Sequence, residues 1–207
     1  MAKTSRPGRG RPRDPEMEER VVLAALQEYG RTGWSGFTMD AVARRAGVGK
    51  STLYLRWPSK EALIRHAIEQ HSKPLTLTDS GSLRADITAL ATSLMRYFLD
   101  PAGWASVRIA IDEAAEHTGL DDVRAYLVTM HGEAASALFQ RAIERGELSA
   151  GAPIPTLTEA LYGTVLMHIL TFTTPERAAA AEHIEQDVAP IVELLLATVS
   201  AHATDTE

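Results

Sequence analysis

Hydroxyl, guanidinium and ammonium side chains gather between residues 38 and 60, in the stretch TMDAVARRAGVGKSTLYLRWPSK. Hydroxyl and ammonium groups suit the phosphate oxygens of nucleic acid, and lysine and serine can also reach base edges. Leucine offers an apolar contact, for example to a thymine methyl group. The candidates for contact with DNA in this stretch are Thr38, Arg44, Lys50, Ser51, Thr52, Tyr54, Leu55 and Lys60.

Two short helices and the turn between them must position these side chains. Thr38 predicts the start of the first helix, because its hydroxyl can accept from a free backbone N–H, and Gly47 predicts its end. A second helix is expected from Lys50 to Arg56, with Leu53 and Trp57 turned inward. After Pro58, Ser59 can cap a third helix. This is the layout of a helix-turn-helix unit whose second helix enters the major groove.

The sequence gives no support for a catalytic function. Gly49-Lys50-Ser51 resembles the end of a phosphate-binding P-loop, but Arg44 stands where that motif needs glycine and the preceding segment is helical. There is no cysteine, and the seven histidines show no His-x-x-x-His or Glu-x-x-His spacing. We therefore expect no enzyme activity, no metal and no cofactor.

The run AVARRAGVGKSTLYLRWPSKEAL resembles the DNA-binding domain of the TetR/AcrR family of transcriptional regulators. The resemblance extends to the preceding helix, Arg20 to Tyr29, and to Gly-Trp-Ser-Gly-Phe-Thr at 33–38, so it covers about the first 70 residues. The C-terminal two-thirds lie outside it. The matching residues are Ala43, Ala46, Gly47, Val48, Thr52, Leu53, Tyr54, Trp57, Ser59, Lys60, Glu61, Ala62 and Leu63.

The resemblance implies roles for these positions. Thr38, Thr52, Tyr54 and Lys60 would hold phosphates, and Lys50, Ser51 and Leu55 would face bases. Leu55 departs from the polar or aromatic residue that is frequent there. The family also implies an all-α fold, in which a three-helix helix-turn-helix domain precedes a helical ligand-binding and dimerisation domain, with about nine helices in all.

The first 13 residues form a basic arm with five cationic side chains and no acid. Its glycines and prolines favour disorder. Arg9-Gly10-Arg11-Pro12 is similar to the core of an AT-hook, in which Arg9 and Arg11 would enter a narrow minor groove. A generic basic tail that only attracts phosphate is an equal alternative.

Charge divides the chain into two parts. Residues 1–70 hold 13 Lys and Arg against eight Asp and Glu, a net charge of +5, whereas residues 71–207 hold eight against 19, a net charge of −11. We expect a disordered arm at 1–13, a DNA-binding domain at 14–70 and a ligand-binding and dimerisation domain at 71–207, with DNA directed to the first two. The N-terminus lacks a signal-peptide pattern, and no apolar run is long enough to cross a bilayer, which predicts a cytoplasmic protein without a membrane partner.

The second part reads as a series of helices. They are expected at 83–99, at about 105–117, at 120–146, at about 156–172 and at 175 to about 201. Pro101 and Gly103 should end the helical pattern of 83–99, and Pro190 should kink or divide the last helix.

The last two helical segments are apolar around much of their circumference, so a second subunit is expected to cover them. The family resemblance likewise implies dimerisation through a four-helix bundle. The alternative is that both helices are central in the monomer. The residues predicted for the dimer interface are Leu161, Val165, Ile169, Ile191, Leu195 and Val199, with Met167, Leu170, Val192, Leu194 and Leu196 on the same helices.

A pocket for a small, largely apolar effector is expected among the helices of 83–173. For each candidate, a place in the ordinary core is the stronger interpretation, and about one in three would touch a ligand. The candidates are Phe98, Trp104, Ile111, Tyr126, Met130, His131, Phe139, Tyr162, Met167, His168 and Phe172. The function predicted from all of this is a homodimeric repressor that binds a palindromic operator and is released by its effector. The alternative is a ligand-independent architectural DNA-binding protein, which the arm would favour.

Overall fold

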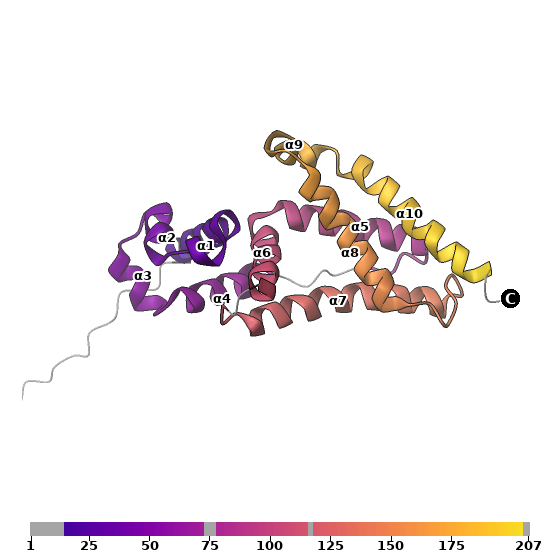
Figure 1. Cartoon of the computed structure of the whole chain (residues 1–207), viewed down its shortest axis with the longest axis horizontal. Helices are drawn as coiled ribbons and strands as arrows, with labels where there is room; N and C mark the ends of the chain where they lie inside the picture. Colours follow the sequence, from indigo (N-terminus) through magenta and orange to yellow (C-terminus); the bar gives the residue numbers. More distant parts are fainter. Residues whose placement is uncertain (1–14, 73–77, 116–117, 205–207) are drawn as a thin grey trace, which may run out of the picture.

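The computed structural model describes residues 15–72, 78–115 and 118–204, and this part of the chain is helical, with no strand (Figure 1). The sequence predicted about nine helices, and the described residues form ten α-helices and one short 3₁₀-helix, η1. Their bounds are α1 (Pro15–Gly36), α2 (Met39–Ala46), α3 (Lys50–Arg56), α4 (Lys60–His71), α5 (Leu83–Leu99), α6 (Pro101–Ala115), α7 (Asp121–Glu144), α8 (Ile154–Thr171), α9 (Thr174–Ala179), η1 (Ala180–Glu182) and α10 (Ile184–Thr204).

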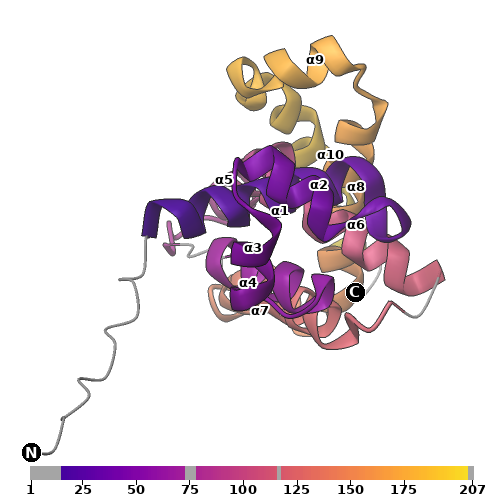
Figure 2. The same ribbon diagram turned by 90° about the vertical axis from the view of Figure 1, so that its left-hand side faces the viewer.

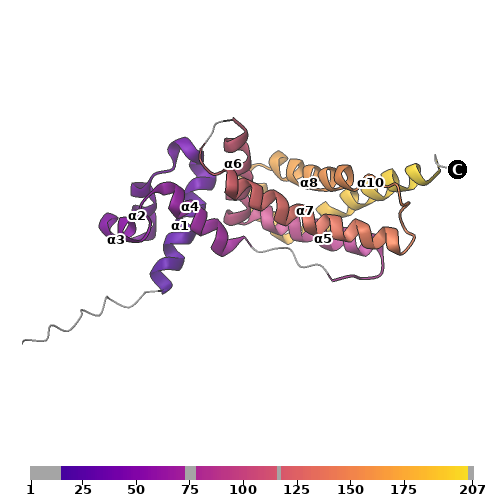
Figure 3. The same ribbon diagram turned by 90° about the horizontal axis from the view of Figure 1, so that it is seen from below.

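The molecule is elongated, with α1 to α4 at one end and the C-terminus of α10 at the other (Figure 1). Helices α5, α7, α8 and α10 run lengthwise through the second half (Figure 3). In that half α5 packs against both α8 and α10, while α1 packs against α6 where the two halves meet. Figure 2, which views the first half end-on, shows α3 and α2 in front of the rest.

Two apolar cores hold the fold together. The first joins α1, α2, α3 and α4 to α6 and the first half of α7, through residues such as Leu26, Ile109 and Leu127. The second joins α5 and the second half of α7 to α8 and α10, through residues such as Leu94 and Leu161. Because α6 and α7 contribute to the first core, helices α1 to α4 share a hydrophobic core with the second half of the chain.

Helix α5 ends at Leu99, as the sequence predicted, but α6 begins at Pro101 rather than at about residue 105. The helix begins at Pro101, where a missing N–H costs nothing and the fixed φ suits the first turn. The carboxylate of Asp100 accepts from the N–H of Ala102 at 2.8 Å and caps the new helix. Gly103 lies inside it because α6 crosses α5 so closely that a Cβ there would stand 1.8 Å from the carbonyl oxygen of Tyr97.

The last helical segment is divided, but not at Pro190. The interruption falls at η1 and His183, between α9 and α10, and α10 continues through Pro190. A proline at this place deprives only the carbonyl of Gln186 of its helical partner. Both Gln186 and Pro190 are exposed, so water can hydrate that carbonyl.

Candidate nucleic-acid interface

The helix-turn-helix unit has the local geometry that its sequence predicted. The Thr38 hydroxyl accepts from the N–H of Ala41 at 3.2 Å and starts α2, and Gly47 ends it in the left-handed region at φ 68°. Leu53 and Trp57 are buried at 1% and 4% exposure. The inward residues of α3 therefore anchor it from one side and leave its other side free.

The free side of α3 carries five of the ten residues predicted to contact DNA. Lys50, Ser51 and Thr52 are exposed, as is Arg44 at the end of α2. Leu55 is 87% exposed, so it contributes almost nothing to the core. Arg9 and Arg11, which were predicted to contact DNA from the arm, lie outside the described residues.

Three of the residues predicted to hold phosphates line one hollow. Thr38, Tyr54 and Lys60 surround a depression of about 400 Å³, together with Ser35, Phe37, Met39, Ser59 and Glu61. The hydroxyl of Ser59 accepts from the N–H of Ala62 at 3.2 Å and caps α4, so the positive end of that helix dipole also faces the hollow. Helices α2, α3 and α4 thus bring two hydroxyls and an ammonium group together.

The ammonium group of Lys60 is held by α1 rather than free in solvent. Its Nζ lies 3.7 Å from the centre of the Trp34 ring and donates to the Trp34 carbonyl at 3.2 Å. A cation over an indole face is stabilised electrostatically and keeps donors for a further partner. Lys60 is therefore pre-positioned at the hollow.

A buried carboxylate, which sequence reasoning did not single out, fixes α2 on α1. Glu28 is 3% exposed and accepts from Arg31 at 2.6 Å and from Arg45 at 2.8 Å. The bond from Arg31 and that from Arg45 hold the pKa of Glu28 below its ordinary value, although burial alone would raise it. A lone acid within an otherwise apolar helical stripe was the only signal of this role in the sequence.

A second acid ties α1 to the two helices that follow the turn. Glu18 forms an ion pair with Arg56 at the end of α3 and accepts from His66 of α4 at 3.0 Å. Through Arg45 of α2 and Arg56 of α3, Glu28 and Glu18 fix the orientation of these two helices relative to α1.

The comparisons with known proteins agree with this geometry. The model of bacterial regulatory proteins of the tetR family matches residues 21–67, and that of the tetracyclin repressor-like C-terminal domain matches residues 77–203. This chain belongs to the TetR family. Both halves are covered, so the assignment extends beyond the helix-turn-helix unit. The TetR-family chain is a DNA-binding transcriptional regulator and not an enzyme.

Its relatives include regulators of several bacteria. A DNA-binding transcriptional repressor TetR of Mycobacteroides abscessus is 31% identical over 173 residues, which cover 81% of this chain and 89% of that protein. An uncharacterised HTH-type regulator of Mycobacterium bovis is 29% identical over 179 residues, 86% of each chain. The solved structure of TylP, a TetR regulator of Streptomyces fradiae, is 20% identical with a TM-score of 0.64, and the match covers 89% of this chain and 87% of that one.

In this TetR-family chain, three of the predicted effector-pocket residues meet in the second half. The ring of His131, from α7, lies 6.3 Å from that of Phe98 and 5.7 Å from that of Tyr162. The Tyr162 hydroxyl donates to the His131 carbonyl at 2.8 Å. The Nε2 atom of His131 is shielded from solvent and has no hydrogen-bond partner among the described residues. Burial lowers the pKa of His131 to about 4, so the ring is neutral at pH 7.

The same ring cluster includes Tyr97, which the sequence did not indicate. Its ring lies 5.0 Å from that of His131, edge-on. Its hydroxyl lies 2.7 Å from that of Ser106 in α6 and 3.3 Å from that of Ser72, the residue that ends α4. Tyr97 thus connects the ring cluster to the end of α4, the helix that follows the helix-turn-helix unit.

The other predicted pocket residues lie elsewhere. Met130 belongs to the first core and Phe139 to the second, while Ile111 and Tyr126 are 54% and 43% exposed. The Trp104 ring lies under the guanidinium of Arg177 at 4.1 Å, where it closes a cleft against α1. The remaining candidates are Met167, which is 60% exposed, and His168, whose ring stands 4.9 Å from that of Phe172.

The residues predicted for the dimer interface are buried or partly buried within the single chain. Leu161, Val165, Ile169, Ile191 and Leu195 are each at most 4% exposed and belong to the second core, and Val199 is partly buried against it. Within one chain they are covered by α5 and by one another. The large apolar side chains that α8 and α10 do expose are Met167, Leu170 and Leu194.

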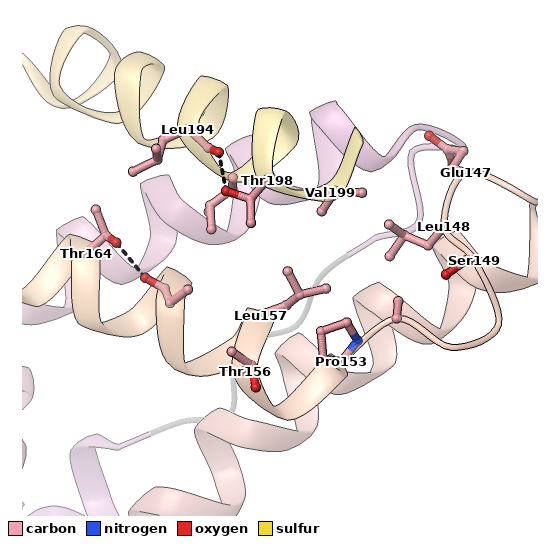
Figure 4. A pocket seen from close by; sticks show the side chains of 13 residues that line it. Glu147, Leu148, Ser149, Pro153, Thr156, Leu157, Thr164, Leu194, Thr198 and Val199 are labelled. Atoms are coloured by element: carbon pink, nitrogen blue, oxygen red, sulfur yellow. Dashed lines mark hydrogen bonds between the residues drawn. The ribbon is translucent and has the colours of Figure 1, made fainter. Parts of the chain in front are cut away.

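Between α8 and α10 lies a cavity of about 420 Å³ that none of the predicted pocket residues lines (Figure 4). Leu194, Thr198 and Val199 form one wall, and Leu157 and Thr164 belong to the opposite one. The segment from Glu147 to Pro153 closes its end. The sequence could not indicate this cavity, because two helices frame it only after they pack on α5.

Across the described ranges, no group of three or more His, Cys, Asp or Glu side chains could hold a metal ion. None of the described helices combines the length and the apolar character that crossing a membrane requires.

Proposed function

We propose that this regulator is a homodimeric repressor that binds a palindromic operator and leaves it when a small molecule binds. The observation that carries its DNA contact is the hollow at which Thr38, Tyr54 and Lys60 meet beside the exposed side of α3. Two hydroxyls, an ammonium group and the N-terminus of α4 together suit one phosphate group.

With a phosphate in that hollow, α3 would lie in the major groove. Lys50, Ser51 and Leu55 would then face base edges, and Thr52 and Arg44 would reach the backbone. The exposure of Leu55 supports this placement. Its side chain, 87% exposed, is not part of the core and can contact a thymine methyl group. The basic arm, with Arg9 and Arg11, would add phosphate or minor-groove contacts.

The dimer would form on the outer faces of α8 and α10. Met167 and Leu170 of α8 and Leu194 of α10 are exposed, and Leu194 also lines the cavity that Figure 4 shows. A second copy related by a two-fold axis would cover them with the same surface. Such a dimer presents two recognition helices about one DNA turn apart, roughly 34–36 Å, which is the spacing of a palindromic operator.

The effector would bind at the ring cluster of Phe98, Tyr97, His131 and Tyr162. The rings supply flat apolar contacts, and Nε2 of His131 supplies a shielded polar atom without a partner. A neutral imidazole favours an uncharged, largely apolar molecule with one hydrogen-bonding group. Through Tyr97 and Ser72, such a molecule would act on α4 and so on the spacing of the two recognition helices.

Selection of random duplex DNA by the purified full-length protein tests the operator. We expect one short palindrome with half-sites about one turn apart. The protein would work in the cytoplasm, where its operator lies. A protein that binds DNA with a steep salt dependence but enriches no sequence would instead be architectural.

A further inference from the structure

An ion pair crosses the turn of the helix-turn-helix unit. Asp40 lies in the first turn of α2 and Lys50 is the first residue of α3, and their side chains meet as Oδ2 and Nζ. Both side chains remain largely accessible, Asp40 at 50% and Lys50 at 62%. The pair therefore lies on the surface proposed to face DNA and not in the core.

The position of the acid is unexpected for a surface that must approach phosphates. A carboxylate there repels DNA, and its favourable interaction with the dipole of α2 would be the same without any contact with Lys50. Arg45, on the same helix, is engaged by Glu28, while Arg44 is exposed. Among these cations, Lys50 is the one that Asp40 restrains.

A restrained lysine differs from a free one in what it can recognise. A free ammonium group on its four-carbon stem can pair with phosphates of any sequence. Held by one of its three donors to Asp40, the ammonium group stays at the start of α3 and keeps two donors for acceptors such as N7 and O6 of guanine.

We infer that Asp40 is a positioning residue that sets base preference by holding Lys50 over the groove. It does so in two ways: it restrains the ammonium group, and its charge penalises DNA in which Lys50 finds no base acceptor. Discrimination against wrong partners by an unfavourable charge is a general route to specificity. The inference rests on the proposed function, in which α3 recognises base pairs of an operator.

The test is parallel selection of random duplex DNA by full-length wild type and by Asp40→Asn, followed by titration of the preferred duplex and a scrambled one. For Asp40→Asn we expect the preference at one base pair of each half-site to fall about two- to fivefold, the range of an exposed ion pair. Binding to the scrambled duplex should tighten and become steeper with salt, because Lys50 is released to phosphates.

Two control variants separate this role from charge alone. Glu16 is an exposed acid in the first turn of α1, so Glu16→Gln makes the same charge change at the same kind of helix position. We expect its base preference to match that of wild type. In a Lys50→Ala background, Asp40→Asn should cause no further change in preference, because there is no ammonium group left to position.

Each outcome has one meaning. Equal preferences for Asp40→Asn and wild type would overturn the inference and leave the operator intact. A change that persists in the Lys50→Ala background would also overturn it, since Asp40 would then contact a base itself. If the wild type enriches no sequence, the operator proposal fails and the inference fails with it.

Discussion

The carboxylate of Asp112 accepts a hydrogen bond from the backbone N–H of Trp34 at 2.8 Å and thereby joins α6 to the end of α1. Gly33 turns this N–H outward, with φ 64° and ψ −174°. The carbonyl of the same Trp34 accepts from Lys60 at the proposed phosphate site. One residue therefore contacts both the second half of the chain and the surface that would face DNA.

Removal of this carboxylate should weaken the junction between the halves. Asp112→Ala leaves the Trp34 N–H without its charged acceptor, so we expect the free energy of unfolding to fall by about 1–3 kcal/mol. Urea denaturation followed by tryptophan fluorescence measures it. Asp121→Ala is the matched control, because Asp121 is an exposed acid 3.6 Å from Arg124 and should change stability by about 0.5 kcal/mol or less. Equal losses in the two variants would show that the junction does not depend on Asp112.

Gly33 itself should not tolerate a side chain. Its dihedral angles belong to a region that is accessible essentially to glycine, and a Cβ would stand 2.5 Å from Nη2 of Arg108. Gly33→Ala should cost about 1–3 kcal/mol of stability. Gly132 in α7 has open space around its Cβ position, so Gly132→Ala should stabilise the helix by about 0.5–1 kcal/mol. Thermal unfolding of both variants checks the opposite signs.

The two kinds of DNA contact can be separated by substitution. Tyr54→Ala should weaken binding to every duplex about equally, because it removes the phosphate contact proposed at the hollow. Lys50→Ala should instead change which base is preferred, by about 1–3 kcal/mol if the contact is bidentate. Titration of wild type and both variants with the selected duplex and its single-base variants measures this. If both substitutions altered preference equally, the assignment of Tyr54 to a phosphate would be wrong.

The parts of the structure that short-range chemistry decides were predictable from the sequence. Thr38, Gly47 and Ser59 set the ends of α2 and the start of α4 through bonds to residues three or four positions away, so the helix-turn-helix unit was confirmed in its elements. The contact of Asp112 with Trp34 joins residues 78 positions apart and left no local pattern. The burial of Leu161, Val165 and Ile169 within one chain was unpredictable for a related reason, since periodicity identifies apolar residues but does not show whether the same chain covers them.

Leu194 offers a direct test of the proposed dimer face. It is 57% exposed in one chain and lines the cavity between α8 and α10, so Leu194→Glu should leave the monomer folded while it prevents a second copy from docking. Analytical ultracentrifugation should show a dimer for wild type and a monomer for the variant. Val128 of α7 is 59% exposed, and Val128→Glu should remain dimeric. A dimeric Leu194→Glu protein would place the interface elsewhere.

Because His131 is neutral in the folded chain, we expect the free energy of unfolding to depend on pH. Burial lowers the pKa of His131 to about 4, below the ordinary value of 6.5, so the folded state binds this proton more weakly than the unfolded state. Its contribution is then constant above pH 6.5 and is lost as the pH falls from 6.5 toward 4, by about 2 kcal/mol at pH 5. His131→Gln keeps a polar side chain without this titration, so its stability should fall less over that range, as urea titrations at pH 7 and pH 5 would show. His183 is exposed, and His183→Gln should retain the wild-type dependence. If wild type and His131→Gln lost equal stability between the two pH values, His131 would not be the source of the acid sensitivity.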